Sequence, residues 1–195
     1  MQVPWRICSI DSDTDETIAV FKQASQLYHL EFGTDRNAPD SLSTFRHLWD
    51  EHLGCSDCVQ ALFVARSSET KTEALNVWGF ACAHPLMRDL DPTLHDLLSF
   101  QNGMQLDPRS TMIISPLVVA PAVYVHAVVK DLVSACKRYA DNYNYDHILL
   151  WQPMVPSELV VVADLCGLET YVAGRLLDDD LVIPPSAIVY WGATS

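Results

Sequence analysis

The sequence predicts an α/β protein, and three observations lead to this prediction. The 195 residues, 49% of them hydrophobic and 19% charged, are enough to bury the core of a single domain covering 1–195. Strand-like runs alternate with amphipathic helical segments along the chain. The clearest strand–helix pair covers 111–145, where an uncharged run rich in β-branched residues ends at Pro121 and a helical pattern follows. Together these features favour a sheet flanked by helices.

The first half of the chain is predicted to contain a strand, two helices and a β-hairpin. Residues 5–10 form the first strand, and an acidic segment suited to a helix N-terminus follows. The two helices cover about 15–32 and 41–53. Strands at 60–67 and 75–84 enclose a charged turn, so we expect them to pair as a hairpin.

The second half is predicted to add the central strand, two helices and three further strands. A polar, proline-containing segment at about 86–109 is expected to be an insertion before the central strand. The long helix after Pro121 has apolar residues with i, i+3, i+4, i+7 spacing, namely Val125, Val128, Val129, Leu132, Val133, Cys136 and Tyr139. The remaining elements are a strand at 147–151, a helix at 156–165 and strands at 171–176 and 183–191.

Charge and composition restrict the expected partners. The formal net charge of -13 would repel nucleic acids and anionic membrane surfaces, so neither is expected as a partner. The N-terminal residues lack the basic start and apolar core of a secretory signal, and the six cysteines are scattered. These features favour reduced thiols and a cytoplasmic protein.

The strand–helix unit resembles motif A of the GCN5-related N-acetyltransferase (GNAT) superfamily. In that family the central strand ends in V-x-P, and the pattern x-x-[R/Q]-x-x-G-x-[G/A] and a helical leucine follow. Here Val119, Ala120 and Pro121 match V-x-P, and Leu132 matches the leucine. The element order is also similar along nearly the whole chain. The resemblance therefore implies a mixed, mostly antiparallel central sheet flanked by helices, with acetyl-CoA or another acyl-CoA as cofactor.

The resemblance also implies where the cofactor binds. The central strand of the family carries a bulge and diverges from the following strand, and the pantetheine arm pairs with its backbone. The first turn of the next helix receives the pyrophosphate. The matching residues here are Leu117, Val118, Val119, Tyr124, Val125, His126, Ala127, Val128 and Val129. This chain differs from the pattern at Tyr124, which replaces Arg or Gln, and at Val129, where a branched side chain is expected to crowd the phosphate.

The candidate catalytic residues are His84, Ser115 and Tyr124. The family's tyrosine acid and glutamate base have no counterpart in this sequence, so another residue must deprotonate the acceptor. His84 at the end of the hairpin strand is the best candidate, and its alternative is a capping histidine. Ser115 is the polar residue that the central strand offers, and Tyr124 is predicted either to bind phosphate or to close the pocket. Trp151, which ends the next strand, and Gln152, which follows it, are predicted to bind substrate.

Two further patterns leave alternatives open. His47, His52, Cys55 and Cys58 have residue types that suit zinc. However, His47 and His52 would point in different directions on a helix, so inert thiols are favoured over a disulfide, and a disulfide over zinc. Acidic clusters at 11–16 and 178–180 are interpreted as solvated turns, with attraction of a cationic substrate as the alternative.

The sequence thus supports three functional hypotheses. The first is an acyltransferase that moves an acyl group from acyl-CoA to an amine or hydroxyl of a small molecule. The second is a GNAT-like enzyme whose pocket performs other chemistry in specialised metabolism, and the third is a non-catalytic binding module. Affinity for CoA distinguishes the first from the others, and an exposed apolar patch would favour the third.

Overall fold

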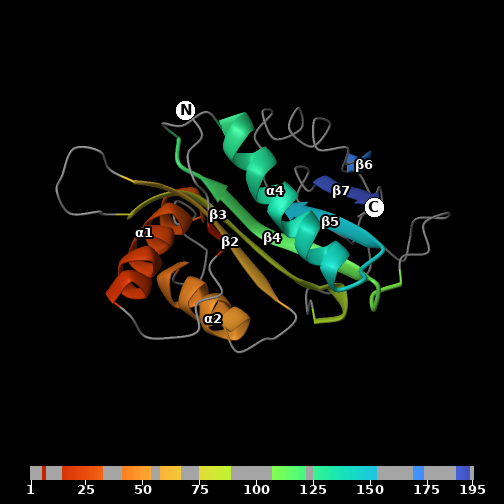
Figure 1. Ribbon diagram of the computed structural model, residues 1–195, viewed down its shortest axis with the longest axis horizontal. Helices are drawn as coiled ribbons and strands as arrows, with labels where there is room; N and C mark the ends of the chain where they lie inside the picture. The colour runs from red at the N-terminus through yellow and green to blue at the C-terminus, as the bar shows by residue number, and fades with distance from the viewer. Residues whose placement is uncertain are drawn as a thin grey trace, which may run out of the picture.

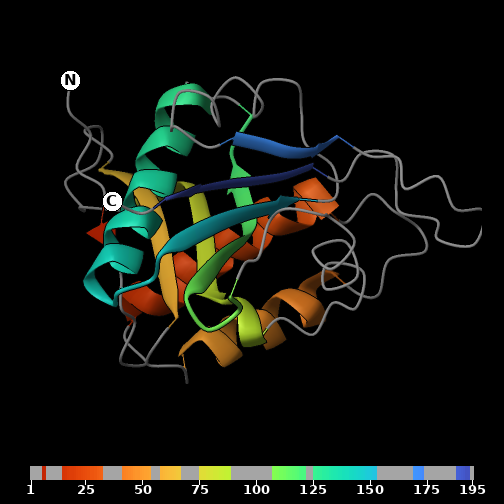
Figure 2. The same ribbon diagram turned by 90° about the vertical axis from the view of Figure 1, so that its right-hand side faces the viewer.

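The computed structural model describes residues 6–7, 15–32, 41–53, 58–66, 75–88, 107–121, 125–152, 169–173 and 188–193. Within these residues seven strands form one sheet in the order β1-β2-β3-β4-β5-β7-β6. The strands are β1 (Arg6–Ile7), β2 (Val59–Arg66), β3 (Leu75–Pro85), β4 (Thr111–Val119), β5 (His147–Gln152), β6 (Glu169–Ala173) and β7 (Ile188–Ala193). All neighbouring pairs are antiparallel except β4 and β5, which are parallel. Strands β5, β7 and β6 run side by side in Figure 2.

Helices cover both faces of the sheet. Helices α1 (Asp15–Phe32) and α2 (Ser41–Leu53) lie on one face, and α4 (Val125–Asn142) lies on the other (Figure 1). A short 3-10 helix, η1 (Leu86–Arg88), follows β3. The predicted mixed, mostly antiparallel sheet flanked by helices is therefore confirmed.

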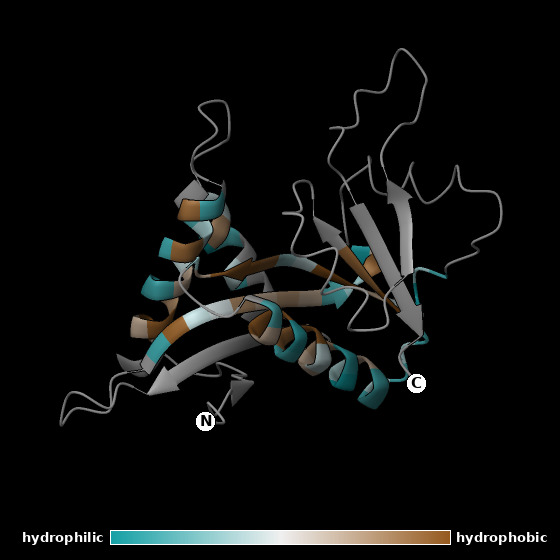
Figure 3. Cartoon of the chain, turned by 90° about the horizontal axis from the view of Figure 1, so that it is seen from above, coloured by the Kyte–Doolittle hydropathy of each residue, from teal (hydrophilic) through white to brown (hydrophobic). Residues whose placement is uncertain are grey.

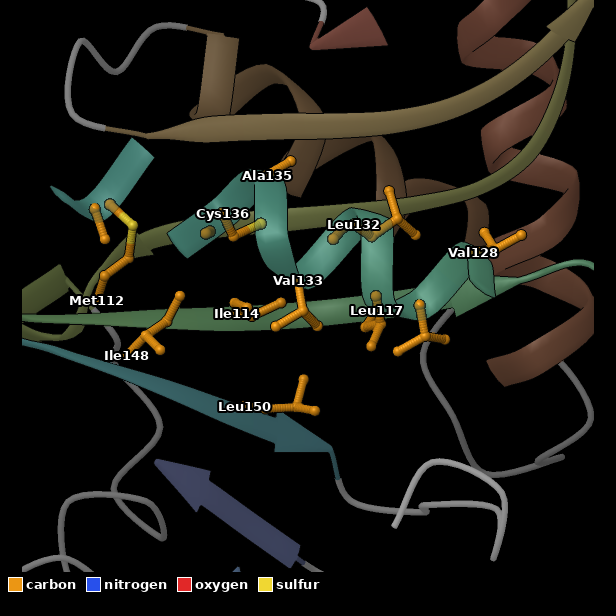
Figure 4. Packing of buried hydrophobic residues seen from close by; sticks show 14 residues of the cluster. Met112, Ile114, Leu117, Val128, Leu132, Val133, Ala135, Cys136, Ile148 and Leu150 are labelled. Atoms are coloured by element: carbon orange, nitrogen blue, oxygen red, sulfur yellow. The ribbon is translucent and has the colours of Figure 1, made fainter. Parts of the chain in front are cut away.

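The core beneath α4 is built from the apolar stripe that the sequence predicts. Val128, Val129, Leu132, Val133 and Cys136 are all at most 2% exposed, and hydrophobic and hydrophilic bands alternate along α4 in Figure 3. The stripe packs on residues of β3, β4 and β5 (Figure 4), and the sheet side of this cluster consists of Ala81, Ala83, Met112, Ile114, Leu117, Ile148 and Leu150. Burial of this stripe anchors α4 across the centre of the sheet.

The opposite face carries an aromatic core. Phe45 of α2 packs against Phe80 of β3, and Phe45 and Trp49 both pack against Phe21 of α1 and against each other, with ring centroids 5.4–5.5 Å apart. Val118 of β4 belongs to the same cluster. Aromatic pairs at these separations attract one another beyond the area that they bury. They fix α1 and α2 to the half of the sheet that contains β3 and β4.

Two irregularities shift the register of the central strands. Between β2 and β3, Phe63 pairs with Gly79 and Val64 with Val77, so Trp78 is an additional residue on β3. Between β3 and β4, Ala83 pairs with Ile114 and Ala81 with Leu117, so Ser115 and Pro116 both lie opposite Cys82. We call 115–116 the β4 bulge. Because side chains alternate along a strand, this extra residue brings Leu117 to the α4 face.

Several predicted elements have the expected limits. The predicted limits of the two N-terminal helices agree with α1 and α2, and the strands at 60–67, 75–84 and 147–151 agree with β2, β3 and β5 to within one residue at each end. The last two strands are shorter or shifted by up to five residues. The predicted helix at 156–165 lies outside the described residues, as does most of the insertion expected at about 86–109. The single-domain assignment remains a proposal.

Candidate functional site

The structural feature that defines the candidate site is the divergence of β4 from β5. The Asp146 and His147 N–H groups both donate to the Ser110 carbonyl oxygen, at 2.8 and 3.2 Å, and hold the beginnings of the two strands together. The parallel register then covers only Thr111 to Ile114 on β4. Figure 4 shows the strands close together near Met112 and further apart toward Leu117. We call the divergence beyond Ile114 the fork, and residues 114–117 its apex.

The backbone of β4 beyond the apex is oriented toward the fork at alternate residues. The Ala120 N–H donates to the Trp78 carbonyl oxygen of β3 at 2.8 Å. In an antiparallel pair the N–H and C=O groups of successive residues point to alternate edges of the strand. The backbone N–H and C=O groups of Val119 and Leu117 therefore point away from β3, toward the fork. An extended ligand containing amides can pair with a strand edge of this kind.

Helix α4 begins beside the C-terminal end of β4. His126 and Ala127 are exposed in its first turn, whereas Val128 and Val129 are each 1% exposed and belong to the core under α4. The expected crowding of a phosphate by the Val129 side chain is therefore wrong, because that side chain points into the core. The helix start presents its N–H groups and the positive end of its dipole, which attract anions.

Gly79 sets how closely α4 approaches the sheet. A Cβ atom on Gly79 would lie 2.9 Å from the Val118 carbonyl oxygen, 3.1 Å from Val128 Cγ1 and 3.3 Å from Leu132 Cδ1. Only a residue without a side chain fits between the strand and this helix. A glycine inside a predicted strand is the sequence signal for such a close approach, but the sequence interpretation did not use it.

The fold brings two of the three predicted catalytic residues to one face of the sheet. Ala83 and Ile114 face α4, so their neighbours His84 and Ser115 alternate to the face covered by α1 and α2. His84 pairs with Ile113, two residues before Ser115 on the adjacent strand. Both side chains are half-buried. His84 thus lies beside the apex, in the region where strand pairing is complete.

Other predicted site residues are described in part or not at all. Tyr124 lies outside the described residues, and Val125 is the first residue of α4. Trp151 and Gln152 end β5 as its last two residues and pair with Val189 and Ile188 of β7. Their backbone forms the second arm of the fork. Leu117 and Val118 are buried and Val119 is half-buried, so these three residues offer a ligand mainly their backbone.

Two cysteines of the described residues, Cys82 and Cys136, are buried in the core. Cys82 and Cys136 are free thiols with no exposed surface. Burial raises the pKa of the Cys136 thiol to about 12. Burial, followed by the proximity of Cys136, also raises the pKa of Cys82. Both thiols are therefore protonated at neutral pH, and a protonated buried thiol is a poor nucleophile.

The sequence left zinc binding, a disulfide and inert thiols open for the His and Cys residues of 47–58. Cys58 forms a disulfide, so the favoured expectation of an inert thiol is wrong for this residue. Its partner lies outside the described residues, since Cys82 and Cys136 are both free. Within the described part of the chain no group of three or more His, Cys, Asp or Glu side chains is arranged to hold a metal ion. In the same part, no helix has the length and apolar character needed to cross a membrane.

Solved structures share this arrangement of strands and helices. An aminoglycoside 6'-N-acetyltransferase complexed with coenzyme A has a TM-score of 0.61 and 11% identity, covering 98% of this chain and 97% of that one. A GCN5-related N-acetyltransferase from Kribbella flavida gives 0.60 and 13%, with the same coverage. A spermidine N-acetyltransferase chimera containing Vibrio cholerae sequence gives 0.56 and 13%, covering 100% and 96%.

The chain has the GNAT fold. No protein-family model and no curated protein sequence matches it. The fork and the start of α4 are the features of the GNAT fold to which the sequence resemblance assigned the cofactor. Sequence reasoning predicted that the central strand carries a bulge but did not locate it at Ser115 and Pro116. The proline within an otherwise apolar strand was the available signal.

Proposed function

We propose that this protein is an acyltransferase that moves an acyl group from acyl-CoA to an amine or hydroxyl group of a small molecule. The observation that carries the proposal is the fork beside the N-terminus of α4. The N–H and C=O groups of Leu117 and Val119 point toward the fork, and α4 begins at the same end of β4. An elongated ligand with a phosphate at one end and amides along its length suits this geometry.

The residues proposed to bind the cofactor fall into two groups. Leu117, Val118 and Val119 form the strand edge for the pantetheine arm. Tyr124 and the start of α4, from Val125 to Val129, form the second group, in which the free N–H groups of the first turn are proposed to receive the pyrophosphate. Val128 and Val129 support this turn from below, since their side chains are buried and their N–H groups enter the helical hydrogen-bond ladder. His126 is exposed in the first turn and is the side chain there that can contact an anion.

The acceptor is proposed to be a cationic amine. A protein with a formal net charge of -13 attracts cations over long distances. Two of the structurally similar proteins are named for aminoglycosides and spermidine, which are polycationic amines. We assign His84 as the general base, because its partner on the neighbouring strand, Ile113, directly precedes the apex. Trp151 and Gln152 at the end of β5 are assigned to the acceptor side of the fork.

Calorimetric titration of the purified chain with acetyl-CoA tests the proposal. We expect micromolar binding of acetyl-CoA and CoA, and weaker binding of ADP, which contains the nucleotide but no pantetheine arm. Release of free CoA on adding spermidine then tests acyl transfer. Absence of acetyl-CoA binding at millimolar concentration would reject the proposal and favour a reassigned pocket or a binding module with the same fold.

A further inference from the structure

The extra residue in β3 places neighbouring side chains on opposite faces of the sheet. Val77 belongs to the aromatic core beneath α1 and α2, whereas Trp78 packs against the core beneath α4. Gly79 also faces α4, since a Cβ atom there would lie 3.1 Å from Val128 Cγ1. Two successive residues therefore face the same helix, which is the effect of a bulge. We call 77–79 the β3 bulge, and its first peptide group connects the two layers of helices.

Helix α1 contacts the β3 bulge through one side chain. The Val77 N–H donates to Gln23 Oε1 at 2.8 Å, between residues that are 54 positions apart in the sequence. A backbone N–H group only donates, so the atom of the Gln23 amide that faces it is the oxygen. Val77 is 8% exposed, and a buried N–H group that loses its acceptor destabilises the conformation that buries it. Gln23 therefore stabilises the bulged conformation of β3.

The next residue of the β3 bulge holds the end of β4. The Trp78 carbonyl oxygen accepts a hydrogen bond from the Ala120 N–H at 2.8 Å, one residue beyond the Gly79–Val119 pair. Pro121 follows and has no N–H group to give to β3. The bond fixes the direction of the Ala120 N–H. Because backbone groups alternate along a strand, it also directs the N–H and C=O groups of Val119 toward the fork.

The two hydrogen bonds depend on each other through the register of β3. Val77 and Trp78 are adjacent, so the connection from Gln23 to Ala120 passes through a single peptide group. If the β3 bulge relaxed to regular pairing, the strand beyond it would shift by one residue. A shift of one residue turns each backbone group to the opposite edge of the strand. The Trp78 carbonyl would then no longer face Ala120.

We propose that Gln23 is a positioning residue for the cofactor-binding edge of β4. The inference rests on the proposed function, in which the backbone of Val119 pairs with the pantetheine arm. Gln23 Oε1 holds the β3 bulge, the bulge holds Ala120, and Ala120 sets the direction of the Val119 N–H. Gln23 itself lies on α1, on the face of the sheet opposite α4 (Figure 1). It therefore acts on cofactor binding through the sheet and not by touching the cofactor.

Binding of acetyl-CoA and ADP to two variants of Gln23 tests the proposal. Methionine has a similar length but no oxygen, so we expect Gln23→Met to weaken acetyl-CoA binding roughly 5-fold. ADP has no pantetheine arm, and its affinity should stay unchanged. Gln23→Glu keeps an acceptor oxygen and should bind acetyl-CoA as wild type does. Gln26→Met, the same substitution at an exposed position of α1, is the matched control and should alter neither affinity.

Amide hydrogen exchange followed by NMR measures the connection directly. In Gln23→Met the amides of Val77 and Ala120 should exchange at least about 5-fold faster than in wild type, because the β3 bulge opens locally. The amide of Leu150 in β5 should keep its rate, whereas general destabilisation would accelerate all three. Gln23→Asn, which withdraws the oxygen by one carbon, is the second variant if Gln23→Met does not fold, and the same changes are expected of it.

Three results would overturn the inference while leaving the proposed function intact. The first is a Gln23→Met protein that binds acetyl-CoA with wild-type affinity. The second is an equal loss of acetyl-CoA affinity in Gln23→Glu, and the third is an equal loss of affinity for ADP and acetyl-CoA in Gln23→Met. If wild type itself does not bind acetyl-CoA, the proposed function fails, and the positioning role fails with it.

Discussion

Ile114 and Leu150 are the last residues that hold β4 and β5 in parallel register. Both are at most 1% exposed and belong to the core under α4. Beyond them β4 remains paired with β3 as far as Val119, and β5 remains paired with β7 as far as Gln152. The sheet therefore keeps its continuity on each side of the fork, and the fork is held open by two well-paired halves.

The orientation of the β4 backbone leads to a first prediction. Val119→Pro removes an N–H group that points toward the fork, whereas Val118→Pro removes one that points toward β3. We expect Val119→Pro to weaken acetyl-CoA binding about 10-fold while the protein stays folded. Val118→Pro should lower the free energy of unfolding by about 3 kcal/mol or more, because it breaks the sheet.

Calorimetry and urea unfolding of the same two proteins measure both effects. The assignment of the strand edge would be wrong if Val119→Pro bound acetyl-CoA as wild type does. It would also be wrong if the two variants lost the same stability, since the alternation of backbone groups distinguishes them.

The close contact between Gly79 and α4 leads to a second prediction. Gly79→Ala would bring a methyl group to 2.9 Å from the Val118 carbonyl oxygen and 3.1 Å from Val128 Cγ1. A backbone oxygen cannot rotate away as a side chain can, so the strand or the helix must shift. We expect a loss of about 1–3 kcal/mol in the free energy of unfolding, measured by urea denaturation.

Ala127→Ser is the control for that measurement. Ala127 is exposed in the first turn of α4, so its replacement should change the free energy of unfolding by less than about 0.5 kcal/mol. A Gly79→Ala protein as stable as this control would show that α4 does not rest on β3 as described.

The buried thiols predict that stability decreases at alkaline pH. Burial raises the pKa of the Cys136 thiol from 9.0 to about 12. Burial is also the main cause of the raised pKa of the Cys82 thiol. Above pH 9.0 the unfolded chain loses these protons while the folded chain keeps them, so the folded state is disfavoured as pH rises. The expected loss is about 1.4 kcal/mol per pH unit for each thiol.

Urea unfolding as a function of pH checks this dependence. Above pH 9.0, Cys136→Ala should make the free energy of unfolding fall less steeply with pH. Ser134→Ala on the same helix should leave this pH dependence unchanged. If the free energy of unfolding of Cys136→Ala depended on pH as that of wild type does, the prediction would be wrong, because the thiol would ionise equally in the folded and unfolded chains.

The sequence predicted the helices of this protein better than the details of its strands. The apolar spacing of α4 fixed which residues face the sheet, and Val128, Val129, Leu132, Val133 and Cys136 are all buried as expected. Such spacing is a local property, so one sequence suffices to detect it. The element order predicted the GNAT fold for the same reason.

The geometry of the candidate site depends on pairing between strands far apart in the sequence. Ser115 was singled out because it is polar, but its position at an apex follows from Ile114 pairing with Leu150, which no local pattern encodes. Similarly, the direction of the Val129 side chain depends on how α4 lies across the sheet. Register and packing of this kind are properties of the folded chain.

The two bulges have a consequence for comparing this chain with others. Each inserts one residue into the alternation of inward and outward side chains, at Trp78 on β3 and at 115–116 on β4. Each strand is therefore two segments in opposite phase. An alignment that matches hydrophobic residues along a whole strand will be out of step by one position on one side of the bulge. Relatives of this protein should accordingly be sought by aligning the two segments of each strand separately.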